Sequence, residues 1–207
     1  MISHKYRCIM IHIPRTGGSS IEKWIHGGDW WSVSPETKHL LASQAKQTYS
    51  EFWDDYFKFA FVRNPWDRMV SCLHFASHFG FPEKRPQQRS SQAEQQKIEF
   101  SGYKEIFGSP VTVEYDHRFY EQSNLLSGAH QPDRIYLNIL DEPIDFVGRF
   151  ETLKDDTRFI REKIGIKKQF NVHVQKSKRK KCEHYYDKHT YEELRQLYAG
   201  DIEAFGY

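Results

Sequence analysis

Two predominantly apolar runs stand out in the pattern of hydrophobic and polar positions along this chain. The first covers about residues 7–13 and the second covers residues 57–62. Near-continuous apolar runs of this length are typical of strands that are buried on both faces of a parallel sheet. Shorter runs at 135–140 and 146–150 are further strand candidates.

Amphipathic stretches predict helices between these strands. The helix after the second strand has Asn64 at its N-cap and Pro65 in its first turn, a pair typical of a helix start. The last helix carries a capping-box pattern from Thr190 to Glu193. Strands that alternate with helices indicate a three-layer, P-loop-like α/β fold with a central, mostly parallel sheet flanked by helices. The last helix covers 190–204, and further helices are predicted around Ile21, Trp24 and Ile25, at 43–56 and at 152–164.

Composition narrows the class of protein. A length of 207 residues with 38% hydrophobic positions suits a single domain, 1–207, with one core. The net charge of +2 gives no general attraction to nucleic acid. Because no apolar run is long enough to span a bilayer, no transmembrane segment is expected and the protein is expected to be cytoplasmic. The polar, repetitive composition around 80–113 predicts a variable insertion or lid.

The turn after the first strand has the composition of an anion-binding loop. The amides at a helix N-terminus, with the positive end of the helix dipole behind them, favour a bound anion. Glycines let the backbone approach that anion closely, hydroxyl groups add donors, and arginine adds a fixed charge. The loop consists of Arg15, Thr16, Gly17, Gly18, Ser19 and Ser20.

A second anion site is expected at the end of the second strand. Arg63 stands there, beside the start of the next helix, where a P-loop kinase would usually place an aspartate that holds magnesium. The first loop also lacks the Gly-Lys pair of a Walker A motif. The three cysteines show no metal-ligand spacing. The sequence therefore predicts two phosphate sites and no metal site.

Four blocks of the sequence resemble the sulfotransferase family that uses 3′-phosphoadenosine 5′-phosphosulfate (PAPS), in its carbohydrate-type, family 2-like branch. Residues 11–20 resemble the loop that binds the 5′-phosphosulfate, and residues 59–71 resemble the 3′-phosphate element. Residues 146–151 and 185–207 resemble later blocks of that branch. The resemblance covers nearly the whole chain apart from about residues 80–113.

The resemblance implies a sulfotransferase that moves the sulfuryl group of PAPS to a hydroxyl of a carbohydrate or glycoconjugate, leaving 3′,5′-ADP. Arg63 and Ser71 would bind the 3′-phosphate, and the first loop would hold the phosphosulfate. Arg15 stands where the family usually has a lysine. An arginine keeps the charge that stabilises the leaving phosphate but cannot donate a proton.

His39 is the preferred catalytic base, since the branch places a histidine at the start of the corresponding segment and imidazole titrates near neutral pH. His12, next to the loop, and Glu36 are the other candidates. Alternatively, His39 is one of eleven histidines with no part in catalysis, and it caps a helix or faces solvent.

Five positive residues gather within 176–181. This run either forms a solvated surface loop, attracts an anionic acceptor, or folds over the nucleotide as a related loop does in the family. In the last case the contacts would be Ser177, Lys178 and Arg179.

Trp30 and Trp31 lie in a loop, 27–38, that is expected to form part of the acceptor wall. Their rings would bind a sugar or adenine, or would pack against the sheet.

Two other functions remain open from the residues themselves. One is a P-loop kinase that uses ATP and magnesium. The other is a non-catalytic nucleotide-binding protein that has lost turnover through the arginine at position 15.

Overall fold

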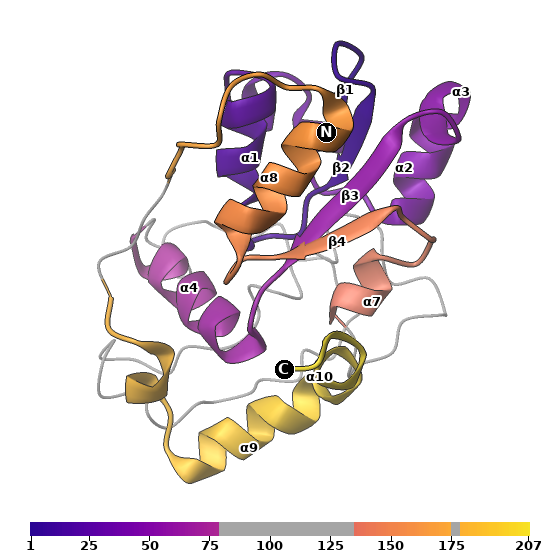
Figure 1. The fold of residues 1–207 in the computed structure, drawn as a ribbon. Coiled ribbons are helices and arrows are strands. Elements are labelled where there is room, and N and C mark those ends of the chain that lie inside the picture. The colour runs from indigo at the N-terminus through magenta and orange to yellow at the C-terminus, as the bar shows by residue number, and fades with distance from the viewer. Residues whose placement is uncertain (79–134, 175–178) are drawn as a thin grey trace, which may run out of the picture.

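A four-stranded, mostly parallel sheet lies at the centre of the computed structural model, which describes residues 1–78, 135–174 and 179–207 (Figure 1). The strand order is β1-β2-β3-β4; β2, β3 and β4 run parallel, and β1 pairs with β2 in the antiparallel sense. The strands at 7–13, 57–62 and 146–150 are confirmed. The strands are β1 (Ile2–Ser3), β2 (Cys8–Ile11), β3 (Phe57–Val62) and β4 (Phe146–Arg149).

Helices follow these strands along the chain. The α-helices are α1 (Gly18–Ile25), α2 (Ala42–Thr48), α3 (Ser50–Trp53), α4 (Pro65–His78), α7 (Ile135–Ile139), α8 (Leu153–Ile164), α9 (Lys188–Leu197) and α10 (Ala199–Phe205). Three short 3₁₀ helices are η1 (Trp30–Ser32), η2 (Pro35–Thr37) and η3 (Cys182–Tyr185). None of the helices in the described ranges has the length and apolar composition needed to cross a membrane.

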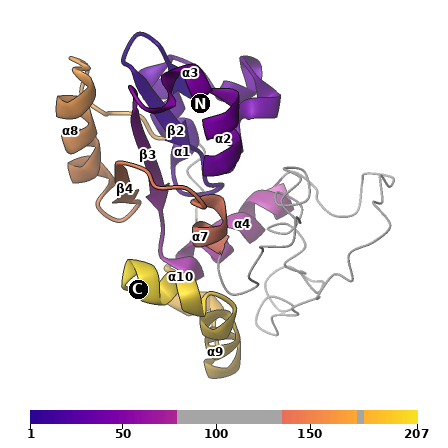
Figure 2. The same cartoon turned by 90° about the vertical axis from the view of Figure 1, so that its right-hand side faces the viewer.

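The two faces of the sheet are buried by different helices, which confirms the predicted α/β layers. Alternate residues of β2 point to opposite faces, as a strand requires. Ile9 and Ile11 join a core that includes Ala42 and Ala45 of α2 and residues of α7, whereas Met10 joins a second core with α1 and α8. Figures 1 and 2 show α1 and α8 on one side of the sheet and α2 and α7 on the other.

The prediction of a strand at 135–140 is wrong, because these residues form helix α7. The buried carboxylate of Asp201, from α10, accepts hydrogen bonds from the backbone amides of Ile135, Tyr136 and Leu137 at 2.6, 2.8 and 3.0 Å. These are the first amides of the helix, which have no partner within it. A cap from a distant residue therefore stabilises a helix that a short apolar run alone does not distinguish from a strand.

Two predicted helices are interrupted. The helix at 43–56 is divided into α2 and α3 at Tyr49, and the helix at 190–204 is divided into α9 and α10 at Tyr198. Helix α9 begins at Lys188, earlier than expected, because Asp187 is its N-cap and accepts from the Thr190 amide at 2.8 Å. Thr190 thus occupies the N3 position of the capping box and not its N-cap.

The carboxyl ends of β2, β3 and β4 meet at one edge of the sheet. The loop before α1 follows β2, Arg63 follows β3, and Phe150 follows β4. The Phe150 amide donates to the Val62 carbonyl at 2.8 Å, so the pairing of β3 and β4 continues to this edge. Open α/β sheets bind ligands at this position.

Candidate functional site

The loop after β2 is held in an unusual backbone conformation. Arg15 has a φ of 67° and Gly17 a φ of 94°, both in the left-handed region. The Thr16 hydroxyl donates to the Ile13 carbonyl at 2.8 Å and the Arg68 guanidinium donates to the Pro14 carbonyl at 2.9 Å. Thr16 and Arg68 are almost fully buried. Side-chain contacts therefore fix the path of this loop, and a non-glycine residue with positive φ is a feature that clusters at functional sites.

Gly18 must be a glycine because it begins α1 directly above the ring of His12. A Cβ atom at this position would lie 2.2 Å from two atoms of that ring. In the first turn of the same helix, Ser19 is half-buried, and the buried Ser20 hydroxyl accepts from the Val174 amide at 3.0 Å. The absence of a Cβ at Gly18 thus lets the start of α1 pack directly on the buried His12 ring.

Arg63 lies at the centre of this edge. Its guanidinium donates to the Arg15 carbonyl at 2.9 Å and to the Asp67 carboxylate at 2.7 Å. The guanidinium Cζ lies over the Phe150 ring, 3.9 Å from the ring centroid. Arg63 is therefore buried among groups from the first loop, α4 and the residue that follows β4, and it connects all three.

Ser71 and Arg179 are joined to the same cluster. The Arg15 side chain donates to the Ser71 hydroxyl through Nε at 3.1 Å and through a terminal nitrogen at 3.0 Å. Arg179 forms an ion pair with Asp67 at 2.7 Å. Burial alone would raise the pKa of the Asp67 carboxyl, but Arg179 and Arg63 lower it below its usual value. The structure thus brings together Arg15, Arg63, Ser71 and Arg179, whereas Ser177 and Lys178 lie outside the described residues, as does the predicted insertion at 80–113.

The charges of this cluster favour an anion. The Asp67 carboxylate pairs with two guanidinium groups, those of Arg63 and Arg179, and Arg63 also donates to the backbone carbonyl of Arg15, whose own guanidinium binds Ser71. Arginine binds carboxylate and phosphate oxygens with the same planar set of donors. The arrangement leaves an excess of positive charge beside the start of α1, where backbone amides also favour negative charge.

His39 lies against the strand end that leads into the loop. Its Nδ1 is 3.0 Å from the His12 carbonyl oxygen, and the two histidine rings are 4.7 Å apart. A carbonyl oxygen accepts only, so Nδ1 carries the proton and the basic lone pair is on Nε2. Burial, followed by the nearby His12, lowers the pKa of His39 well below its usual value, so the imidazole is neutral at physiological pH.

The other two candidate bases are placed differently. The ring of His12 is buried beneath Gly18, and its Nδ1 lies 2.5 Å from the Glu22 carboxylate. Glu36 is exposed in η2, where its carboxylate accepts from the Ser34 hydroxyl, and this bond lowers its pKa. His12 is therefore turned into the interior and Glu36 is a weaker base than usual.

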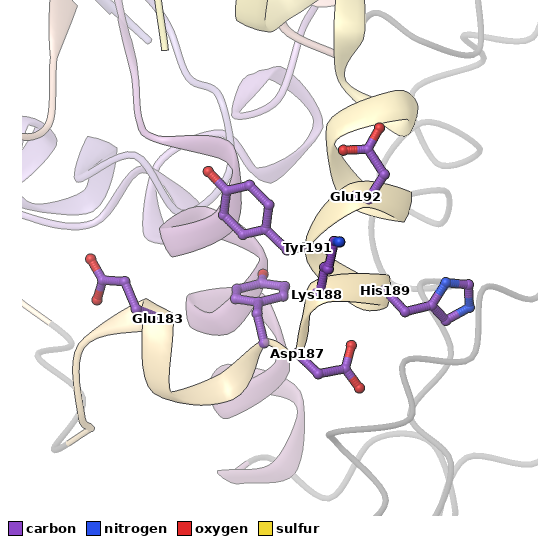
Figure 3. A pocket seen from close by; sticks show the side chains of 7 residues that line it. Glu183, Asp187, Lys188, His189, Tyr191 and Glu192 are labelled. Atoms are coloured by element: carbon purple, nitrogen blue, oxygen red, sulfur yellow. The ribbon is translucent and has the colours of Figure 1, made fainter.

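A separate pocket lies at the start of α9, with a volume of about 760 Å³. Figure 3 shows its side chains around the first turns of that helix. Three of them are carboxylates, which disfavours a phosphate ligand, and none is a residue predicted to bind the nucleotide. The lining residues are Glu183, Tyr186, Asp187, Lys188, His189, Tyr191 and Glu192.

Comparison with known proteins agrees with the geometry of the sheet edge. A family model described as "Sulfotransferase family" matches residues 1–207, the whole chain. The chain belongs to the sulfotransferase family. Carbohydrate sulfotransferase 10 from Xenopus laevis is 24% identical over 243 residues, and that from Homo sapiens is 27% identical over 242 residues. Each alignment covers 100% of this chain and 66% of the relative, so the chain spans about two-thirds of their length.

The resemblance to the carbohydrate-type branch is thereby confirmed. The α/β fold expected for the sulfotransferase family is confirmed too. The roles of individual site residues stay predictions, although the structure places the first loop, Arg63 and Ser71 in one connected cluster.

A buried ionic network beneath the loop was missed by the sequence reasoning. The Glu22 carboxylate is fully buried and accepts from Lys38 at 2.8 Å and from the Trp30 amide at 3.0 Å, in addition to its contact with His12. Lys38, itself buried, also pairs with Asp29. The available signal was a glutamate on the apolar side of α1, immediately after Ile21.

Burial alone would raise the pKa of Glu22, but the hydrogen bonds from His12 and Lys38 and the charge of His12 lower it to about 2. The folded-state pKa therefore lies below the value of 4.5 for an unperturbed carboxyl. Ionised Glu22 stabilises the fold fully above pH 4.5, and this contribution is lost as the pH falls toward 2.

The variant Glu22→Gln should lose about 3 kcal/mol in the free energy of unfolding at pH 7, because Lys38 and His12 lose their charged acceptor in the interior. Between pH 4.5 and 2 its stability should fall less steeply than that of the wild type. Urea denaturation across this pH range is the measurement, with Glu162→Gln, an exposed glutamate of α8, as the control. Equal stability of Glu22→Gln and wild type at pH 7 would show that the network does not stabilise the fold.

Proposed function

We propose that this protein transfers the sulfuryl group of PAPS to a hydroxyl of a carbohydrate or glycoconjugate. The observation that carries this proposal is the hydrogen bond from Arg63 to the loop before α1, which joins the two elements predicted to bind anions at one sheet edge. Membership of the sulfotransferase family supports it, as do relatives named carbohydrate sulfotransferases. A cytoplasmic location stays a prediction from the sequence.

The residues at the sheet edge fit a donor that carries two anionic groups. The left-handed Gly17 and the close packing of Gly18 on the His12 ring set the path of the loop into α1, whose first amides favour an anion, and Arg15 adds positive charge to this loop. Arg63, Ser71 and Arg179 would hold the 3′-phosphate. Arg63 and Arg179 both pair with the Asp67 carboxylate, so their guanidinium donors are already directed at anionic oxygen atoms. When bound, PAPS supplies an activated sulfuryl group.

His39 would remove the proton from the acceptor hydroxyl. The hydrogen bond to the His12 carbonyl fixes both the orientation of the ring and the tautomer. Nε2 would therefore accept the proton of the acceptor hydroxyl. Because the pKa of His39 is lowered, the imidazole remains in its basic form throughout the neutral range. Arg15 would stabilise the charge on the leaving phosphate without donating a proton.

The variant Arg63→Ala should bind 3′,5′-ADP about 10- to 100-fold more weakly, since it loses charged hydrogen bonds to the 3′-phosphate. Binding of 5′-AMP, which lacks that phosphate, should change much less. Isothermal titration of both nucleotides provides the measurement, and Arg158→Ala, an exposed arginine of α8, is the control. If Arg63→Ala folds normally and still prefers 3′,5′-ADP as strongly as the wild type, the second anion site is not at Arg63.

The variant His39→Ala should transfer sulfate about 10²- to 10⁴-fold more slowly, because the general base is absent, while its affinity for 3′,5′-ADP is retained. In the wild type, kcat/KM should fall only below pH 6.5, as His39 becomes protonated at its lowered pKa. Transfer assays with [35S]PAPS over a pH series test both statements, with the exposed His189→Ala as the control. Full activity of His39→Ala would assign the base to another residue.

A further inference from the structure

We propose that the exposed ring of Trp31 is the platform on which a sugar ring of the acceptor stacks, so that one of its hydroxyls meets His39. This inference rests on the proposed function, because it concerns the acceptor of the same reaction. It assigns the two tryptophans of the 27–38 loop to different roles.

The two tryptophans differ sharply in exposure. Trp30 is 5% exposed and its indole donates to the Thr37 hydroxyl at 2.8 Å, so it anchors the loop. Trp31 is 48% exposed, and so is Val33 in the same loop. Among the side chains described at residues 1–72, 135–174 and 179–207, only two other large hydrophobic ones, Phe159 and Tyr191, are comparably exposed. The 27–38 loop thus exposes two large apolar side chains, Trp31 and Val33, while Trp30 holds it in place.

The position of Trp31 connects it to the reaction. Its ring centroid lies 5.6 Å from that of His39, with the rings at 65° to each other. A general base must approach the acceptor hydroxyl to about 2.6–3.2 Å. The sugar ring that bears this hydroxyl then lies in the space beside Trp31, and its C–H groups can pack on the indole face. Adenine is a poorer occupant, because the nucleotide base does not carry the reacting hydroxyl.

The loop holds this ring in place before any ligand binds. The Trp31 amide donates to the Asp29 carboxylate at 2.9 Å, and Asp29 pairs with the buried Lys38. The Lys38 ammonium, 5.6 Å from the Trp31 ring centroid, is fixed by Glu22. The buried network beneath the donor loop therefore also orders the exposed tryptophan. A ring that is ordered in advance loses little conformational entropy when a ligand binds.

The test uses the full chain saturated with 3′,5′-ADP and a glycan array of neutral and uronic-acid-containing oligosaccharides. Trp31→Ala should bind the glycans selected by the wild type about 10-fold more weakly and raise the acceptor KM by a similar factor. Its Kd for 3′,5′-ADP and its free energy of unfolding should be unchanged. Trp31→Phe should restore most of the binding, and Ser32→Ala, in the same turn, should match the wild type.

Several outcomes would overturn the proposal. Unchanged glycan binding by Trp31→Ala would remove Trp31 from the acceptor site. A weaker Kd for 3′,5′-ADP would indicate that adenine stacks there, and a loss of stability with normal glycan binding would indicate that the chain itself covers the ring. Unchanged glycan binding by Trp31→Ala contradicts the Trp31 proposal alone, whereas a wild type that binds no glycan or no 3′,5′-ADP contradicts the proposed function.

Discussion

The hydrogen bond from the Arg63 guanidinium to the Arg15 carbonyl is the interaction on which the candidate site depends. It joins the end of β3 to the loop that follows β2, at the edge where parallel strands end. The same guanidinium lies over Phe150 and pairs with Asp67, which also pairs with Arg179. Four segments that are distant in sequence are thereby held around one positively charged position. Such a position is suited to a ligand with two separated anionic groups.

Beneath this edge, a second constraint acts through buried charge. Glu22 and Lys38 are costly to bury, and each stabilises the fold only because the other groups of the network satisfy it. The network fixes the His12 ring under Gly18 and, through Asp29, the turn that carries Trp31. Since the His12 carbonyl also accepts from His39, the donor loop, the candidate base and the candidate acceptor platform share one rigid support.

Local sequence patterns predicted the parts of the structure that local interactions determine. The apolar runs of β2 and β3 and the glycine-rich turn each contain their own signal, and family resemblance linked the turn to Arg63 and Ser71. The helix at α7 could not be predicted, because its cap, Asp201, lies more than sixty residues away. The pairing of Glu22 with Lys38 was missed because a glutamate on the apolar side of a helix indicates a buried charge but does not identify its partner, which here lies sixteen residues away. The contrast between Trp30 and Trp31 likewise depends on tertiary packing.

The central claim is that the chain binds a nucleotide with separate 5′ and 3′ anionic groups. Calorimetric titration of the wild-type protein with 3′,5′-ADP, 5′-AMP and ATP, each with and without magnesium, tests it most directly. The account predicts tight binding of 3′,5′-ADP that does not depend on magnesium, with weaker binding of 5′-AMP and ATP. Preferential, magnesium-dependent binding of ATP would contradict the account and favour a kinase.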